Sequence, residues 1–147
     1  MSKYTMNKAS VMIHFDIDWG LSQKENFDGY NLLVDGKETG ISFHQNVTRN
    51  ENGGLVADKG TGWRVVCANG MSLAAPHNGM PKRQNAFHWA IAMYEEFRRI
   101  DPFSPLPLDK AYFDNCAAEG CTSDGKQVWV SRALDAYNKL EVNDGNA

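Results

Sequence analysis

The first half of the chain alternates apolar and polar residues with a period of two. In residues 11–19 the apolar positions are Val11, Ile13, Phe15, Ile17 and Trp19, and the polar positions between them include His14, Asp16 and Asp18. This alternation predicts a half-buried strand that ends at Gly20, with its apolar side packed against helices. Residues 21–29 are largely polar and are predicted to form a loop.

A hairpin is predicted next. Residues 30–34 and 40–47 are rich in strand-forming residues and flank Asp35-Gly36. An Asp-Gly pair between two such runs favours a tight turn, because glycine adopts positive φ without steric cost.

More strand and loop signals follow the hairpin. Residues 48–62 carry many Gly and Asn residues and are predicted to form a loop. The run Trp63–Cys67 predicts another strand, and residues 71–75 a partner for it across the Asn69-Gly70 turn.

The strongest helix signal covers residues 84–100. Apolar residues recur there at intervals of three and four, which is typical of an amphipathic helix. His88 is predicted to lie opposite this apolar stripe.

Two more helices are predicted. Residues 101–107 contain three prolines, which cannot continue a helix. A short helix is predicted over residues 108–118. A last helix is predicted over residues 125–140, although the Val-Trp-Val run within 127–131 leaves a strand as the alternative.

Strands followed by helices indicate an α+β fold in one domain, residues 1–147. We expect a mainly antiparallel sheet of about four to five strands from the N-terminal half, packed against about three C-terminal helices. The chain has 147 residues, of which 42% are hydrophobic and 22% charged, which excludes a disordered or low-complexity protein.

Charge and cysteine content limit the possible partners and the cellular compartment of the protein. The formal net charge of −3 argues against a protein that binds nucleic acid mainly by neutralising its phosphate charges. No run of about 18 apolar residues and no secretion signal is present, so we expect no membrane partner. Three cysteines are an odd number for a closed disulfide framework, and a reduced, cytoplasmic protein is predicted.

One polar row has the composition of a catalytic site. His14, Asp16 and Asp18 alternate along one strand face, so their side chains can converge on a water or an ion. His44 could join them if strand pairing brings it alongside. The simpler interpretation is the solvated face of an amphipathic strand, and we predict no resident metal and no cofactor.

The cysteines and glycines offer weaker candidates. Cys67 ends a predicted strand and could act as a nucleophile, although a buried apolar role is commoner for cysteine. Cys116 and Cys121 lack the spacing of a zinc site. The Gly53-Gly54 loop leads into a strand rather than a helix, which argues against a phosphate cradle.

Two tryptophans are candidates for binding. Trp19 and Trp63 lie beside polar loops, where large amphipathic rings often anchor a partner. A place in the core would suit both equally well.

Residues 62–76 are similar to a strand-turn-strand of plasmid antirestriction proteins, which carry a Ser-Asn-Gly and Ala-Pro run. The similarity covers about fifteen residues, and that family begins with helices where this chain predicts strands. Residues 64–70 also resemble a short stretch in uncharacterised phage and plasmid proteins. The resemblance implies a mobile-element protein and assigns no site residue.

These observations favour a small accessory or inhibitory protein of the kind that phages or plasmids encode, which acts by binding a host protein. The first alternative is a small metal-assisted or acid–base enzyme that uses His14, Asp16 and Asp18, with His44. The second alternative is nucleic-acid binding.

Overall fold

The sheet is built around the turn at Asp35 and Gly36. Both residues have positive φ, 51° and 80°, as a two-residue hairpin turn requires. The turn joins β2 (Leu21–Val34) to β3 (Lys37–Gln45), and it confirms the predicted hairpin. Strand β1 (Tyr4–Ile17) pairs with β2 antiparallel along its whole length.

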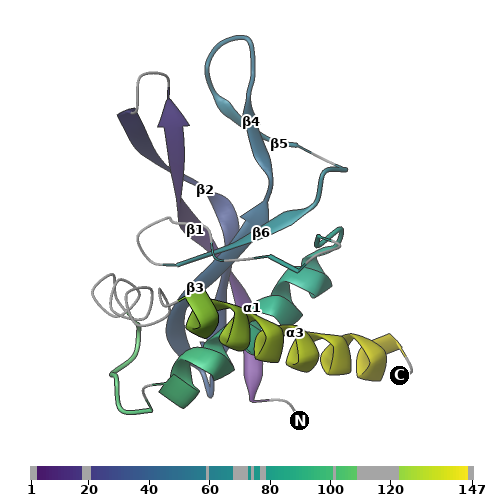
Figure 1. Ribbon diagram of the computed structural model, residues 1–147. Helices are drawn as coiled ribbons and strands as arrows, with labels where there is room; N and C mark the ends of the chain where they lie inside the picture. The colour runs from purple at the N-terminus through teal and green to yellow at the C-terminus, as the bar shows by residue number, and fades with distance from the viewer. Residues whose placement is uncertain are drawn as a thin grey trace.

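A computed structural model gives the arrangement of these elements (Figure 1). It describes residues 3–17, 21–58, 60–67, 73, 75–76, 79–100, 102–108 and 123–145. The four-stranded antiparallel sheet has the order β1-β2-β3-β6, and β4 and β5 form a separate two-stranded sheet. The remaining elements are β4 (Val47–Arg49), β5 (Leu55–Ala57), β6 (Trp63–Cys67), α1 (Arg83–Ile100) and α3 (Ser123–Gly145).

Two predicted loops contain strands. Residues 21–29, predicted as a loop, form the first part of β2, because pairing with β1 along a continuous register outweighs their polar composition. Residues 48–62 include the end of β4 and all of β5, a short hairpin. The predicted strand at Trp63–Cys67 is confirmed, and most of its predicted partner, residues 71–75, lies outside the described residues.

The helix predictions are confirmed in two places. Helix α1 matches the predicted 84–100 helix, and α3 covers and extends the predicted 125–140 helix, so the strand alternative at 127–131 is wrong. The described part of the chain holds two helices rather than about three. The third prediction, residues 108–118, lies outside the described residues except for Leu108.

The core lies between one face of the sheet and α1. Paired residues of antiparallel strands share a face, and the register sets Lys8, Tyr30, Phe43 and Val65 in one row across the four strands. Phe43 and Val65 are buried in that row and belong to the same apolar cluster as Trp89 and Met93 of α1. Helix α3 covers the other side of α1, where Ala133 and Tyr137 join the cluster.

Strand β1 changes the face that it buries partway along its length. Its contribution to the helix-facing core comes from Tyr4 and Met6, which share the face of Lys8. Val11 and Ile13 are also buried, at 3% and 4% exposure, but alternation places them on the opposite face, and they lie outside that cluster. The prediction that the odd-numbered side of this strand packs against the helices is therefore wrong.

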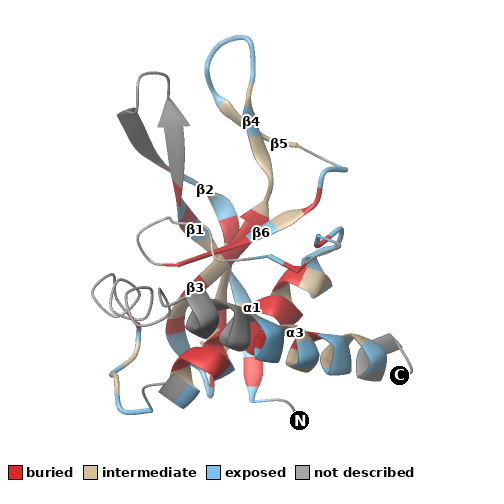
Figure 2. Cartoon of the chain, viewed as in Figure 1, coloured by how far each residue is buried: buried red, intermediate tan, exposed pale blue. Residues whose placement is uncertain are grey.

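The two hairpins lie at the end of the molecule away from the helices (Figure 1). The β1–β2 and β4–β5 hairpins extend there on the same side (Figure 1). No residue of β4, of β5 or of the turn between them is buried, in contrast to the layer between sheet and helices (Figure 2). Among the described helices, none is long and apolar enough to cross a bilayer.

Two glycines with similar backbone angles should respond differently to substitution. Gly40 has φ of 90°, and a Cβ there would meet the Leu108 carbonyl oxygen and lie 2.8 Å from the Leu108 nitrogen. Gly36 has φ of 80°, with nothing within 4 Å of a Cβ. We expect Gly36→Ala to lower the free energy of unfolding by about 1 kcal/mol and Gly40→Ala by at least about 2 kcal/mol, measured by urea denaturation. Equal losses would contradict the close packing of Leu108 on β3.

Candidate binding groove

The row predicted as a catalytic site is only partly described. The side chains of His14 and Asp16, and all of Asp18 and Trp19, lie outside the described residues, so their roles stay predictions. His44 is described, and the backbone does not set it beside His14. A Cβ built on Gly29 would lie 3.1 Å from the His44 Cβ, and Gly29 pairs with Ala9. His44 is therefore level with Ala9, five positions or roughly 17 Å along the strand from His14.

His44 is a buried, neutral imidazole. Its side chain is 1% exposed, and its Nδ1 donates a hydrogen bond to the Gln45 carbonyl oxygen. The Nε2 atom is buried without a hydrogen-bond partner. Burial lowers the pKa of His44 below its ordinary value of 6.5, and Arg64 lowers it further, whereas the hydrogen bond to Gln45 opposes them.

The other candidates for metal and thiol chemistry have no built site in the described chain. No three His, Cys, Asp or Glu side chains within the described ranges gather as a metal would require. Cys67 is a buried thiol, 4% exposed, in the helix-facing core. Cys116 and Cys121 lie outside the described residues.

A groove of about 550 Å³ crosses the sheet where the two hairpins separate. We call it the sheet groove. Five of its residues lie on the helix-facing side of the sheet by register. Its lining comprises Lys8, Ala9, Phe27, Asp28, Gly29, Tyr30, Gln45, Ala57 and Trp63.

Aromatic rings form the floor of the sheet groove. Tyr30 stacks on Phe43 with ring centroids 5.6 Å apart, and Trp63 lies 6.1 Å from Tyr30 and 6.3 Å from Phe43. Phe43 is fully buried, whereas Tyr30 and Trp63 are half-buried and line the groove. Trp63 thus packs against the core and also lines the groove, and its role in binding stays a prediction.

The groove aromatics are held in place by polar contacts. The Trp63 amide donates to the Met80 carbonyl at 2.8 Å. Arg83, at the first turn of α1, donates from its Nη1 to the Tyr30 hydroxyl at 2.9 Å, and its guanidinium carbon lies 5.1 Å from the Tyr30 ring centroid. These contacts and the packing of both rings on Phe43 restrain Tyr30 and Trp63 in the free protein.

The charges in the sheet groove balance. Lys8 and Asp28 are its charged lining residues. A groove for a nucleic-acid backbone needs surplus positive charge. The arrangement instead suits a neutral or weakly charged ligand with apolar parts that pack on Tyr30 and Trp63.

A second groove, also of about 550 Å³, lies at the other end of α1, and several of its side chains bind one another or neighbouring residues. Arg98 donates from its Nε to the Tyr94 hydroxyl at 3.0 Å and from its Nη1 to the Ser104 carbonyl. The Tyr4 hydroxyl donates to Glu95 at 3.1 Å, and burial together with Glu95 raises the pKa of Tyr4. These contacts tie the strand layer and the 102–108 segment to α1, which is a structural role.

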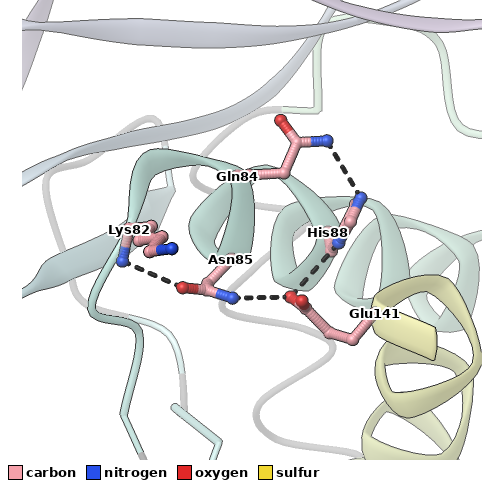
Figure 3. A network of polar contacts seen from close by, with 5 residues as sticks. All are labelled: Lys82, Gln84, Asn85, His88 and Glu141. Atoms are coloured by element: carbon pink, nitrogen blue, oxygen red, sulfur yellow. Dashed lines mark hydrogen bonds and ion pairs between the residues drawn. The ribbon is translucent and has the colours of Figure 1, made fainter. Parts of the chain in front are cut away.

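A polar network that includes the buried His88 joins α1 to α3 (Figure 3). His88, predicted to lie opposite the apolar stripe of α1, is 3% exposed because α3 covers it. Its Nε2 accepts from the Gln84 amide at 3.1 Å, and its Nδ1 lies 3.2 Å from Glu141 Oε1. The two ring nitrogens of His88 therefore face side chains of α1 and α3.

The rest of the network supports the helix contact. Asn85 donates to Glu141 at 2.9 Å and accepts from the Lys82 amide at 2.9 Å, which caps the start of α1. Burial and the neighbouring Glu141 raise the pKa of Tyr137 to about 12, so its hydroxyl stays protonated. This network holds the helices together.

The sequence singled out Trp63, which lines the sheet groove, but not the residues around it. Tyr30 and Lys8 belong to the same groove, and Arg83 orients Tyr30. Period-two alternation places Tyr30 on a strand but not beside Trp63, because that neighbourhood depends on the register of β2, β3 and β6.

No family model, curated protein or solved structure matches this chain. Function is therefore inferred from the geometry of the sheet groove.

We expect His44 to make the stability of the fold depend on pH. Its pKa is lowered in the folded state, so below about pH 6.5 the unfolded chain binds a proton that the folded chain does not. The contribution of a neutral His44 to the unfolding free energy is therefore fully present above pH 6.5. It decreases as the pH drops, by at most about 1.4 kcal/mol per pH unit for one proton. His44→Phe should remove this component, measured as the difference in urea unfolding free energy between the two proteins from pH 7.5 to 5. A constant difference across that range would contradict a neutral, buried His44.

Glu141→Ala should weaken the attachment of α3 to α1. The change removes the acceptor of Asn85 and the carboxylate beside His88, and because Glu141 is partly exposed we expect a loss of about 1 kcal/mol in unfolding free energy. Asp135→Ala, at an exposed position of the same helix, is the control and should change stability by less than about 0.5 kcal/mol. Equal effects of the two variants would show that the network contributes nothing specific.

Proposed function

We propose that this protein acts by binding a partner protein in the sheet groove, with Trp63 and Tyr30 as the anchor residues. The observation that carries the proposal is the pair of half-buried rings that face a groove of about 550 Å³. Rings of this kind contribute much of the binding energy of protein interfaces, because they bury a large area with few rotatable bonds.

Preorganisation supports the proposal. The Trp63 amide is bonded to Met80, and Arg83 fixes the Tyr30 hydroxyl. A ligand that packs on these rings does not have to order them first, which lowers the entropic cost of association. The size of the groove lies within the range of 300–1,000 Å³ for compact ligands, so we expect it to take a small part of a partner rather than a whole flat surface.

The balanced charge of the lining favours a protein partner over nucleic acid. Lys8 and Asp28 offer one charge of each sign at the groove, and the whole chain has a net charge of −3. The sequence-based expectation of an accessory or inhibitory role for a phage or plasmid makes a bacterial host protein the first partner to test.

The proposal is tested by capture from a bacterial lysate with wild-type protein and two aromatic variants. Trp63→Ala should reduce recovery of a stoichiometric partner at least tenfold, because it removes the anchor ring. Phe103→Ala removes a ring that is 91% exposed and lies outside the sheet groove, so it should leave recovery within twofold.

A second groove variant separates binding from folding. Trp63 also packs against Phe43, so circular dichroism and a melting curve must first show that the variant is folded. Lys8→Glu changes an exposed residue of the groove without touching the core and should also weaken capture. A partner retained by folded Trp63→Ala and by Lys8→Glu, or lost with Phe103→Ala alone, would show that the sheet groove is not the binding site.

A further inference from the structure

One edge of β2 has no strand beside it for most of its length. Strand β2 pairs with β1 from Leu21 to Val34, but its register with β3 covers only Tyr30–Val34. Within the described chain, residues 21–29 therefore have strand pairing on one side only. We call the other side the free edge of β2. Unpaired strand edges are templates for a further strand.

The direction of the main-chain groups along β2 can be assigned. The Leu32 carbonyl accepts a hydrogen bond from Thr39 Oγ1 of β3, so the main-chain polar groups of Leu32 point toward β3. The register between β1 and β2 has no interruption, so this direction alternates regularly along β2. Asp28 and Asn26 therefore point their N–H and C=O groups toward the free edge, whereas Phe27 points toward β1.

The free edge borders the sheet groove. Four consecutive residues of β2, from Phe27 to Tyr30, line it. Successive side chains of a strand point to opposite faces, so a run of consecutive lining residues indicates that the edge of the strand itself is exposed to the groove. The main chain of Asp28, which among the described residues has no strand partner on this side, and the rings of Tyr30 and Trp63 are thus parts of one surface.

We propose that the sheet groove takes an extended segment of the partner protein, which pairs with the free edge of β2 as an added strand. This inference rests on the proposed function and specifies how the partner is held. Donors and acceptors that repeat every second residue match the main chain of another strand, which presents the same repeat. One side chain of the added segment packs on Tyr30 and Trp63 and supplies specificity.

The test uses a phage-displayed library of random 12-residue linear peptides, selected on the wild-type protein alone, and the enriched peptides are then measured against Trp63→Ala. Binding of the enriched peptides is also measured against Asp28→Pro, which removes an N–H group that points to the free edge. Ser10→Pro is the matched control. Ser10 pairs with Asp28, so its N–H also points away from the hairpin, but toward the outer edge of β1. Proline is tolerated at such outward positions of a strand.

We expect Asp28→Pro to weaken peptide binding at least tenfold and Ser10→Pro to change it by less than threefold. N-methylation of a single peptide amide should abolish binding at every second position of the peptide and at no position between them. If Trp63→Ala binds the peptides as well as wild type, the proposed function fails. If Trp63→Ala loses binding while Asp28→Pro retains it, the groove holds its ligand by side chains alone and only strand addition is wrong. Failure to enrich any linear peptide also overturns the inference.

Amide hydrogen exchange tests the same point without a variant. In the free protein the amides of Asn26 and Asp28 should exchange fast and that of Phe27 slowly, and bound peptide should protect the first two. Protection of Asn26 and Asp28 in the free protein at low concentration overturns the inference. Protection that grows with protein concentration identifies a second copy of the chain as the occupant, which also overturns it.

Discussion

The pairing of Tyr30 with Phe43 is the contact on which the rest of the structure depends. Phe43 is fully buried, belongs to the cluster that joins the sheet to α1, and pairs with Val65 of β6 on its other side. After Phe43, β3 remains paired with β6 but no longer pairs with β2. The approach is close, because a Cβ at Gly29 would lie 2.7 Å from the Phe43 carbonyl oxygen. The pairing of β2 with β3 therefore ends at a contact that belongs to the core, and the sheet groove lies where the two hairpins separate beyond it.

Local signals in the sequence predicted the local parts of this fold. The Asp35-Gly36 turn and α1 are confirmed, because turn chemistry and a 3.6-residue period act within a few residues. The change of buried face along β1 could not be predicted in this way. Alternation shows which residues share a face, but only the contacts of β2, β3 and α1 decide that Tyr4 rather than Val11 meets the helix-facing core.

The candidate site was predictable only in part for the same reason. Trp63 stands out in the sequence as a large ring beside a loop, yet Arg83 and Tyr30 are 53 residues apart and meet only in the folded chain. His88 was placed by its sequence pattern on the polar side of α1, yet it is buried. The pattern of α1 alone places it opposite the apolar stripe, and its burial depends on Glu141 and the rest of α3. The burial of a residue between two helices can be predicted only when the position of the second helix is known.

The two ends of the molecule differ in how firmly they are held, and this difference suits a binding site between the hairpins. The helix layer is fixed by buried rings and by the His88 network. The hairpins are joined by the ion pair between Glu25 and Arg49, 3.3 Å apart, whose side chains are about one-third exposed. Such a pair contributes at most about 1 kcal/mol. Breaking this ion pair to admit a segment of chain therefore costs little energy, while Phe43 and its neighbours keep Tyr30 and Trp63 in position.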